Sequence, residues 1–182
     1  ALLPRKFKIA ITGSKKDRAI VQAHDIGLEF FTDINQQMAI KVWVGGGLGR
    51  TPILGSVIKE KLSWEHILTY CEAILRVYNL YGRRDNMYKA RIKILVKALG
   101  IDKFRDLVEK EWEFIKNGPN TINNSELNRV KAFFTEPHYI KDTKNDLESH
   151  IQDKSFSQWL SRCTQSHKKK HYRSVTLSLK SN

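Results

Sequence analysis

Residues 42–52 (Val-Trp-Val-Gly-Gly-Gly-Leu-Gly-Arg-Thr-Pro) contain the residue types best suited to binding an anion. Three successive glycines, Gly45, Gly46 and Gly47, end an alternating apolar run, and Arg50 follows shortly after them. Glycine can adopt positive φ and lets successive backbone N–H groups point into one concavity, which binds phosphate or carboxylate oxygens. A plain sharp turn explains the same glycines, so this segment by itself leaves both interpretations open.

Two known nucleotide-binding loops do not fit this segment. The dinucleotide fingerprint needs a third glycine where Arg50 stands, and the P-loop needs Gly-Lys followed by Ser or Thr. What remains is a glycine loop with an arginine beside it, which suits a ligand rich in negatively charged oxygen.

The chain of 182 residues is strongly basic, with 32 Lys and Arg against 19 Asp and Glu and a formal net charge of +13. A positive field of this kind attracts polyanions: nucleic acid, an anionic membrane, or a multiply carboxylated or phosphorylated small molecule. The hydrophobic fraction of 41% is enough for a core. The sequence therefore predicts one globular domain or slightly more.

Targeting signals and cysteines are scarce. The chain has no apolar run of about 18 residues and no secretory leader, so we predict a cytoplasmic protein with no membrane partner. Because the sequence begins at Ala1 and enters a strand-like pattern almost at once, we expect a piece of a longer polypeptide. Cys71 and Cys163 are its only cysteines, too few for a disulfide framework or a four-cysteine metal or cluster site. Cys71 lies on an apolar helical stripe and is interpreted as a small buried hydrophobe.

Hydrophobic periodicity predicts an α+β fold, with a mixed or antiparallel sheet packed against three helices. The predicted strands cover residues 6–11, 28–31 and 38–44, and the last two form a hairpin across turn residues 33–37. The predicted helices run from a cap at Ser63 to Gly82, from a cap at Asp85 to Gly100, and from about residue 103 to 115.

Composition changes after the third predicted helix. We predict a first domain over residues 1–116, a linker over 117–155, and the start of a second α+β segment over 156–182. Residues 156–163 favour a short helix, and residues 173–180 alternate like a strand. That strand needs a sheet to bury its apolar side, so the second segment is predicted to be incomplete.

Three motifs, in this order and spacing, resemble the sirohaem-dependent sulfite and nitrite reductases. They are Leu3-Pro4-Arg5-Lys6-Phe7-Lys8, Val44-Gly45-Gly46-Gly47-Leu48, and Gly82-Arg83-Arg84-Asp85 running on to Lys89-Ala90-Arg91-Ile92-Lys93. The resemblance is specific from about residue 2 to residue 112, which look like a first sirohaem-binding domain. It is weaker from residue 156 on, which looks like the opening of a second ferredoxin-like half-domain.

The resemblance implies a six-electron reduction of sulfite to sulfide, or of nitrite to ammonia. It places this reaction at the iron of a sirohaem coupled to a 4Fe–4S cluster through a shared cysteine, with ferredoxin or a flavoprotein as electron donor. The composition agrees, because sirohaem carries eight carboxylates and burying it requires Lys, Arg and backbone donors. A small oxyanion at the iron also needs cations to hold it and to supply protons as its oxygens leave as water.

The same motifs imply the site residues. Around the substrate anion, the catalytic residues are Arg5, Arg91 and Lys93. The cofactor contacts are Arg5, Lys6, Lys8, Asp25, Gly45, Gly46, Gly47, Arg50, Arg83 and Arg84.

Two of these assignments depart from the family pattern or from helix geometry. The family often has Lys at the position of Arg91, which keeps the charge but changes donor geometry and proton transfer. On a regular helix Arg91 and Lys93 would point about 200° apart. Both reach one site only if the helix begins late or if the long side chains curl round it.

The paired-cysteine motifs that ligate the family's cluster and sirohaem iron are absent from this sequence. We therefore expect the chain alone to be inactive, with the remainder of the same polypeptide as a required partner. The alternative from another class is a basic nucleic-acid-binding module, motivated by the net charge and by residues 167–173 (His-Lys-Lys-Lys-His-Tyr-Arg). A third possibility is a structural fragment that binds nothing in isolation.

Overall fold

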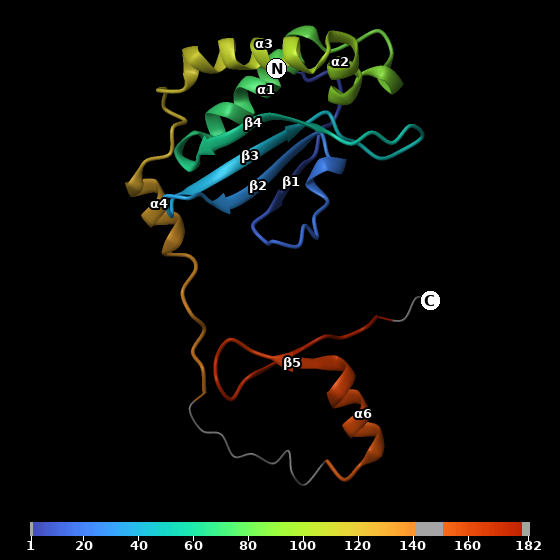
Figure 1. The fold of residues 1–182 in the computed structure, drawn as a ribbon, viewed down its shortest axis with the longest axis vertical. Coiled ribbons are helices and arrows are strands. Elements are labelled where there is room, and N and C mark those ends of the chain that lie inside the picture. The colour runs from blue at the N-terminus through green and yellow to red at the C-terminus, as the bar shows by residue number, and fades with distance from the viewer. Residues whose placement is uncertain (1, 141–150, 180–182) are drawn as a thin grey trace. The chain divides into compact units, whose positions relative to one another are not determined.

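The computed structural model describes residues 2–140 and 151–179. The chain divides into two compact units, residues 1–134 and 135–182 (Figure 1). The first unit contains all the predicted site residues. In the two described ranges, every helix is too short or too polar to cross a lipid bilayer.

A four-stranded mixed sheet is the base of the first unit. Its strands, in spatial order, are β1 (Ile9–Thr12), β2 (Ile26–Thr32), β3 (Met38–Val44) and β4 (Ser56–Ser63). β1 runs parallel to β2, while β2–β3 and β3–β4 are antiparallel. The predicted hairpin of β2 and β3 is therefore confirmed. Its turn is held by the carboxylate of Asp33, which accepts hydrogen bonds from the backbone N–H groups of Asn35 and Gln37.

The hydrophobic pattern of the sequence did not predict strand β4. Only Ile58 and Leu62 of its eight residues are buried, and the register against β3 shifts on both sides of Val42. Such a strand lacks the strict alternation by which a half-buried strand is recognised. It forms because β3 offers a free edge and because helices cover its inner face.

Three helices pack on one face of the sheet (Figure 1). They are α1 (Ile67–Tyr81), α2 (Ile92–Leu99) and α3 (Ile101–Ile115), with 3-10 turns η1 (Val21–Ala23), η2 (Trp64–His66) and η3 (Met87–Lys89). The core joins sheet residues such as Ile26, Ile40 and Val42 to Tyr70 of α1 and Phe104 of α3. The predicted α+β class, a sheet packed against three helices, is confirmed.

Helix α2 begins later than the sequence predicts. Asp85 does not cap it, because its carboxylate pairs with the guanidinium of Arg83. Asn86 instead caps η3 by accepting a hydrogen bond from the N–H of Tyr88 at 2.9 Å. The backbone of Arg91 is extended (φ −72°, ψ 157°), and α2 starts at the next residue.

Residues 117–155, predicted to be irregular, contain helix α4 (Asn124–Lys131). The side chain of Asn123 caps it by accepting a hydrogen bond from the N–H of Glu126 at 2.8 Å. The N–H of Ile122 donates to the carbonyl of Glu65, which attaches this stretch to the first unit. Residues 141–150 of the predicted linker lie outside the described residues, and the predicted domain boundaries stay a prediction.

Among its described residues, the second unit contains α6 (Lys154–Cys163) followed by a hairpin of β5 (Thr164–Ser166) and β6 (Arg173–Val175). The predicted short helix is confirmed, with Asp153 as its cap. The predicted strand 173–180 is wrong in length, because pairing stops at Val175 and Leu177 and Leu179 are exposed. Lys180 lies outside the described residues.

Candidate functional site

The buried carboxylate of Asp25 is the centre of the contacts among the predicted site residues. Asp25 lies between η1 and β2 and is 0% exposed. Its Oδ1 accepts a hydrogen bond from Nε of Arg91 at 3.1 Å, and its Oδ2 accepts one from Nη2 at 2.6 Å. Oδ2 also accepts from the backbone N–H of Lys8 at 3.0 Å, and the carbonyl of Asp25 accepts from the N–H of Gly45 at 3.0 Å. One residue thus joins the entry to β1, the glycine loop and Arg91.

Arg91 and Lys93 converge on Gly47. A Cβ placed on Gly47 would lie 3.1 Å from Nη2 of Arg91 and 3.2 Å from Cδ of Lys93, so both side chains pass over this glycine. The convergence is possible because Arg91 precedes the helix in an extended conformation whereas Lys93 lies in its first turn. Of the two alternatives left by the sequence, the late helix start is the one observed.

The two cations differ in how their charges are neutralised. Arg91 forms a forked ion pair with Asp25, and in the part of the chain that the structure describes its Nη1 donates no hydrogen bond. Lys93 is only 8% exposed, and its Nζ donates to the carbonyls of Thr51 at 2.5 Å and Gly47 at 3.5 Å. Across the described ranges Lys93 has no carboxylate partner. A buried ammonium without a counter-ion is costly, so this arrangement favours an anionic ligand.

Arg5 lies beside the segment that leads into Arg91. The hydroxyl of Tyr78 lies 3.1 Å from the carbonyl of Arg5 and 2.8 Å from the carbonyl of Ala90. Burial raises the pKa of Tyr78, so the phenol keeps the proton that it donates. The guanidinium of Arg5 donates from Nη1 to the carbonyl of Met87 at 2.5 Å, and lies 5.7 Å from the ring centre of Tyr88.

The glycine loop packs inward and does not form the predicted anion cradle. The N–H of Gly45 donates to the carbonyl of Asp25, and the N–H of Gly47 donates to the carbonyl of Ile53 at 2.9 Å. Gly47 and Ile53 form a bridge, so the residues between them are a hairpin tip. A Cβ on Gly46 would lie 2.0 Å from the carbonyl oxygen of Gln22. The glycines are therefore needed for close backbone approach, and the plain-turn interpretation is the better one.

The other predicted cofactor residues lie outside this cluster. Arg83 is paired with Asp85, and Arg84 donates to the carbonyls of Leu2 and Asn79 at 2.9 Å each. Three further predicted residues are exposed, and over the described ranges their side chains form no hydrogen bond or ion pair: Lys6, Lys8 and Arg50.

Sequence reasoning missed two contributors to the cluster. Tyr78 belongs to the apolar face of α1 and was interpreted as core, although its hydroxyl holds Arg5 and Ala90 together. Thr51 contributes only its carbonyl, which any residue carries, so no residue type could have indicated it. The one signal that the sequence offered is the hydroxyl of a tyrosine on an apolar helical stripe, because a buried tyrosine hydroxyl usually finds a hydrogen-bond partner.

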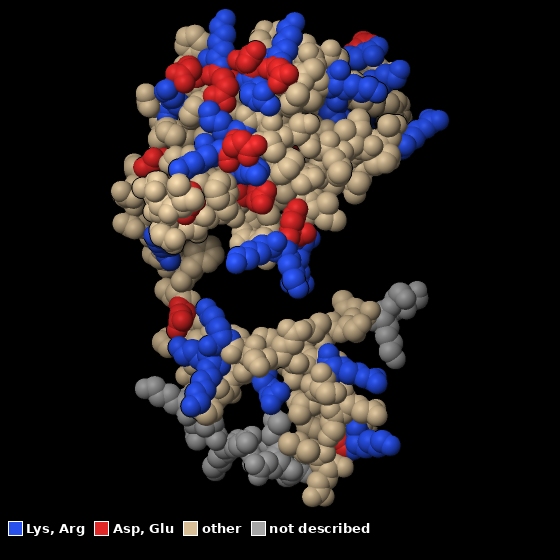
Figure 2. Space-filling view, viewed as in Figure 1, with Lys and Arg blue, Asp and Glu red and all other residues tan. Residues whose placement is uncertain are grey.

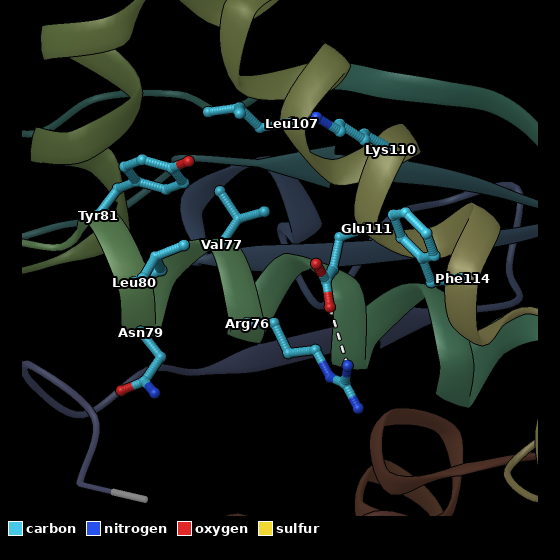
Figure 3. A pocket seen from close by; sticks show the side chains of 9 residues that line it. All are labelled: Arg76, Val77, Asn79, Leu80, Tyr81, Leu107, Lys110, Glu111 and Phe114. Atoms are coloured by element: carbon cyan, nitrogen blue, oxygen red, sulfur yellow. Dashed lines mark hydrogen bonds and ion pairs between the residues drawn. The ribbon is translucent and has the colours of Figure 1, made fainter.

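Charge is unevenly distributed over the visible face of the first unit. Figure 2 shows basic and acidic side chains intermixed over α3, whereas the region of α2 is mainly basic. A separate pocket of about 460 Å³ lies between α1 and α3 (Figure 3). Arg76 on its edge donates to Glu111 at 2.8 Å, and none of the predicted site residues lines it. We assign no ligand to this pocket.

In the described part of the chain, metal-ligating residues are not clustered. Within residues 2–140 and 151–179, no group of three or more His, Cys, Asp or Glu side chains could hold a metal ion. Cys71 packs against the core, and burial raises the pKa of its thiol to about 11. A thiol in this environment is a poor source of thiolate.

A family model described as "Nitrite and sulphite reductase 4Fe-4S domain" matches residues 1–116 of the chain. The chain belongs to this family. The predicted resemblance is confirmed, and Arg5, Asp25, Gly47, Arg91 and Lys93 all lie within the matched residues.

Relatives of this reductase-family chain carry sulfite reductase names. "Sulfite reductase (ferredoxin) 1" of Mycolicibacterium paratuberculosis is 33% identical over 112 residues, which are 62% of this chain and 20% of that protein. "Sulfite reductase (NADPH) hemoprotein beta-component" of Chromohalobacter salexigens is 33% identical over 114 residues, which are 59% of this chain and 20% of that protein. The chain thus spans about a fifth of the length of these relatives.

A solved structure shares the fold of the reductase-family segment. The NirA protein of Mycobacterium tuberculosis is 32% identical and superposes with a TM-score of 0.56 over 61% of this chain and 20% of that protein. The sheet and helices that position Asp25, Arg91 and Lys93 therefore belong to a fold already seen in that protein.

Proposed function

We propose that the first unit is the part of a sirohaem-dependent sulfite or nitrite reductase that supplies cations to the cofactor carboxylates and to the substrate anion. The observation that carries this proposal is the convergence of Arg91 and Lys93 over Gly47, within the family-matched residues that also include Arg5. The reaction of the whole protein would be the six-electron reduction of sulfite to sulfide or of nitrite to ammonia. Ferredoxin or a flavoprotein would deliver the electrons, in the cytoplasm.

The cationic cluster fits a polycarboxylate ligand. Lys93 is a buried ammonium that lacks a carboxylate partner among the described residues. Nη1 of Arg91 donates no hydrogen bond to any of these residues. An anionic ligand would supply the missing partner for both groups. When bound, sirohaem would supply the iron at which the anion is reduced. Arg91, Lys93 and Arg5 are the proposed holding residues, and exposed Lys6, Lys8 and Arg50 are proposed further contacts.

The structure gives weaker support to five of the cofactor contacts that the family motifs imply, namely two arginines and three glycines. Arg83 and Arg84 are engaged by neighbouring groups of the chain, so a ligand would have to displace those partners. Gly45 and Gly47 have donated their N–H groups internally, and all three glycines are buried, so the backbone of this loop offers an anion little in this conformation.

The 4Fe–4S cluster does not fit this chain. Its ligation requires a set of cysteine thiolates, and the sequence contains two cysteines that are 92 positions apart. We propose that the cluster ligands come from the remainder of a longer polypeptide.

The side chains of the cluster would divide two tasks. A guanidinium can hold and orient an oxyanion but does not release a proton in proteins, and holding is the task that we propose for Arg5 and Arg91. Lys93 Nζ is the group of the three that can transfer one. We propose that it donates to a departing substrate oxygen.

Binding of the cofactor tests this proposal directly. The purified chain is titrated with sirohaem and followed by its visible absorption, with Arg91→Gln, Lys93→Gln and, as control, Arg83→Gln. Loss of a charge-assisted contact is worth about 1.5–3 kcal/mol, so the first two variants should each bind roughly tenfold more weakly or worse. Arg83→Gln should remain within about twofold. Equal losses in all three variants would show that bulk charge, and not this cluster, binds the ligand.

Two further measurements complete the test. Without added cofactor the chain should reduce neither sulfite nor nitrite with a chemical electron donor, and turnover would contradict the account of the missing cysteines. A thermal melt of each variant separates loss of binding from loss of folding.

A nucleic-acid-binding function is the second candidate, and residues 167–173 of the second unit favour it. This hairpin carries four Lys and Arg residues, together with aromatic contacts of Tyr172. However, Lys169 is paired with Glu136 at 3.0 Å and lies 4.7 Å from the ring centre of Tyr139. Affinity for RNA or DNA should fall steeply with salt, whereas capture of sirohaem should survive moderate salt. The salt dependence of both titrations therefore separates the two functions.

A further inference from the structure

We propose that Asp25 is a positioning residue of this site. Its carboxylate holds the guanidinium of Arg91 over Gly47, so that Nη1 is presented to an oxyanion of the sulfite or nitrite class. The inference rests on the proposed function, and it changes the role of Asp25 from a cofactor contact to a group that acts through Arg91.

The geometry of the ion pair fixes the guanidinium plane. Both oxygens of Asp25 accept from Arg91, at 3.1 Å from Nε and 2.6 Å from Nη2. A fork of two parallel bonds determines orientation as well as distance, which a single contact does not. The nitrogen left over is Nη1, and the Arg91 side chain keeps 21% of its surface exposed. The buried carboxylate of Asp25 thus sets the direction in which the two N–H groups of Arg91 Nη1 point.

Asp25 is held by two further hydrogen bonds, one to its carboxylate and one to its backbone carbonyl. The N–H of Lys8 donates to Oδ2 at 3.0 Å, and the N–H of Gly45 donates to the carbonyl of Asp25 at 3.0 Å. Asp25 therefore cannot follow Arg91 if the arginine moves. With its oxygens occupied and its own negative charge, it is also poorly suited to contact a carboxylate of the cofactor.

Simple charge counting and positioning give opposite expectations. Removing the negative charge of Asp25 raises the net positive charge near Arg91, so Coulomb attraction alone predicts tighter binding of an anion. If Asp25 aims the guanidinium, its removal frees the side chain of Arg91 to adopt many rotamers, and binding weakens. The sign of the effect decides between them.

Asp33 provides a matched control at the opposite end of the same strand. Asp25 immediately precedes β2 and Asp33 immediately follows it. The carboxylate of Asp33 accepts two backbone N–H bonds, one more than the carboxylate of Asp25, and pairs with one cation, Lys61. Asp33→Asn therefore removes a carboxylate charge with comparable contacts, at the other end of β2 from Asp25.

The experiment uses the purified 182-residue chain and sodium sulfite as the probe. The Nε–Hε signals of arginine are followed by NMR during the titration in wild type, Asp25→Asn, Asp33→Asn, Arg91→Gln and the double variant of Asp25 and Arg91. We expect Asp25→Asn to weaken sulfite binding at least fivefold and to speed exchange of the Arg91 Hε proton at least tenfold. Asp33→Asn should change both by less than twofold. In the Arg91→Gln background, Asp25→Asn should cause no further loss of affinity.

Each contrary result has a distinct meaning. Unchanged or tighter binding by Asp25→Asn, or an undiminished effect of Asp25→Asn in the Arg91→Gln background, would overturn the positioning role alone. No binding by the wild-type chain would overturn the proposed function, and the positioning role of Asp25 with it. If Asp25→Asn fails to fold, the wild-type titration still decides: the Arg91 Hε proton must stay protected in the sulfite-bound state, and its loss of protection on binding refutes the proposal.

Discussion

Replacement of Gly46 by alanine tests whether the three glycines exist for close packing. A Cβ at this position would lie 2.0 Å from the carbonyl oxygen of Gln22 and 2.7 Å from that of His24. Both neighbours are backbone atoms, which cannot rotate aside as a side chain can. To reach an ordinary contact of 3.4 Å, the Gln22 oxygen would have to move by about 1.4 Å.

Such a movement would disturb several hydrogen bonds at once. The Gln22 carbonyl accepts from the N–H of Gly55 at 2.7 Å, and Gln22 belongs to η1, which ends two residues before Asp25. Overpacking of a well-packed interior costs about 1–3 kcal/mol, occasionally more. Because the clash is with fixed backbone, we expect a loss of about 3 kcal/mol, which corresponds to a fall in Tm of roughly 6–12 °C for a chain of this size.

Thermal and urea unfolding followed by circular dichroism provide the assay, with two companion variants. In Gly47→Ala the clashing atoms are the movable ends of Arg91 and Lys93, at 3.1–3.2 Å, so the loss should be only about 1 kcal/mol. Gly13→Ala meets its nearest atom at 4.0 Å, so its stability should change by no more than about 0.5 kcal/mol. The expected order of destabilisation is Gly46, then Gly47, then Gly13. If Gly46→Ala is as stable as Gly13→Ala, the close approach of the glycine loop to η1 is refuted.

Two further predictions concern buried groups of the helices. Burial raises the pKa of Cys71 from 9.0 to about 11, so the folded state holds the thiol proton more tightly than the unfolded state. Stability should then fall as pH rises from about 9 towards 11, by on the order of 2 kcal/mol from this group. The slope should be shallower in Cys71→Ala, and an unchanged slope, measured by urea unfolding, would contradict it. Glu109 accepts a hydrogen bond from the buried hydroxyl of Tyr70 at 2.6 Å and pairs with Lys59 at 2.8 Å. Glu109→Ala should therefore cost about 1–3 kcal/mol, since it leaves that hydroxyl without an acceptor. In the Tyr70→Phe background the cost should be smaller, and equal costs in both backgrounds would rule out the pairing.

The most periodic elements of the fold could be predicted from the sequence. Helix α1 buries residues at spacings of three and four, including Tyr70, Ile74 and Tyr78, and β3 buries alternate residues. In both elements the apolar pattern follows directly from the geometry of the backbone. β4 and α4 escaped prediction because each has few buried residues, so their formation depends on neighbours that only the folded chain provides.

The start of α2 shows the limit of local rules. Asp85 is an acceptable cap by residue type, but its carboxylate is taken by Arg83, and the helix begins six residues later than an Asp85 cap allows. The late start of α2 makes the cationic cluster possible, because it lets the side chains of Arg91 and Lys93 reach the same glycine. A competition between two partners for one carboxylate cannot be read from spacing alone.

The sequence by itself determined that the chain is basic and α+β, that it resembles a reductase family, and that Arg5, Arg91 and Lys93 belong to one set of motifs. These properties depend on residue types, charge and periodicity, which are written in the order of residues. Only the tertiary structure determined that Asp25 forms a forked ion pair with Arg91 and that the glycine loop packs inward. It also determined that Lys93 is buried without a carboxylate partner among the described residues. Those outcomes depend on which groups, distant along the chain, compete for the same hydrogen bonds and the same space once the core has formed.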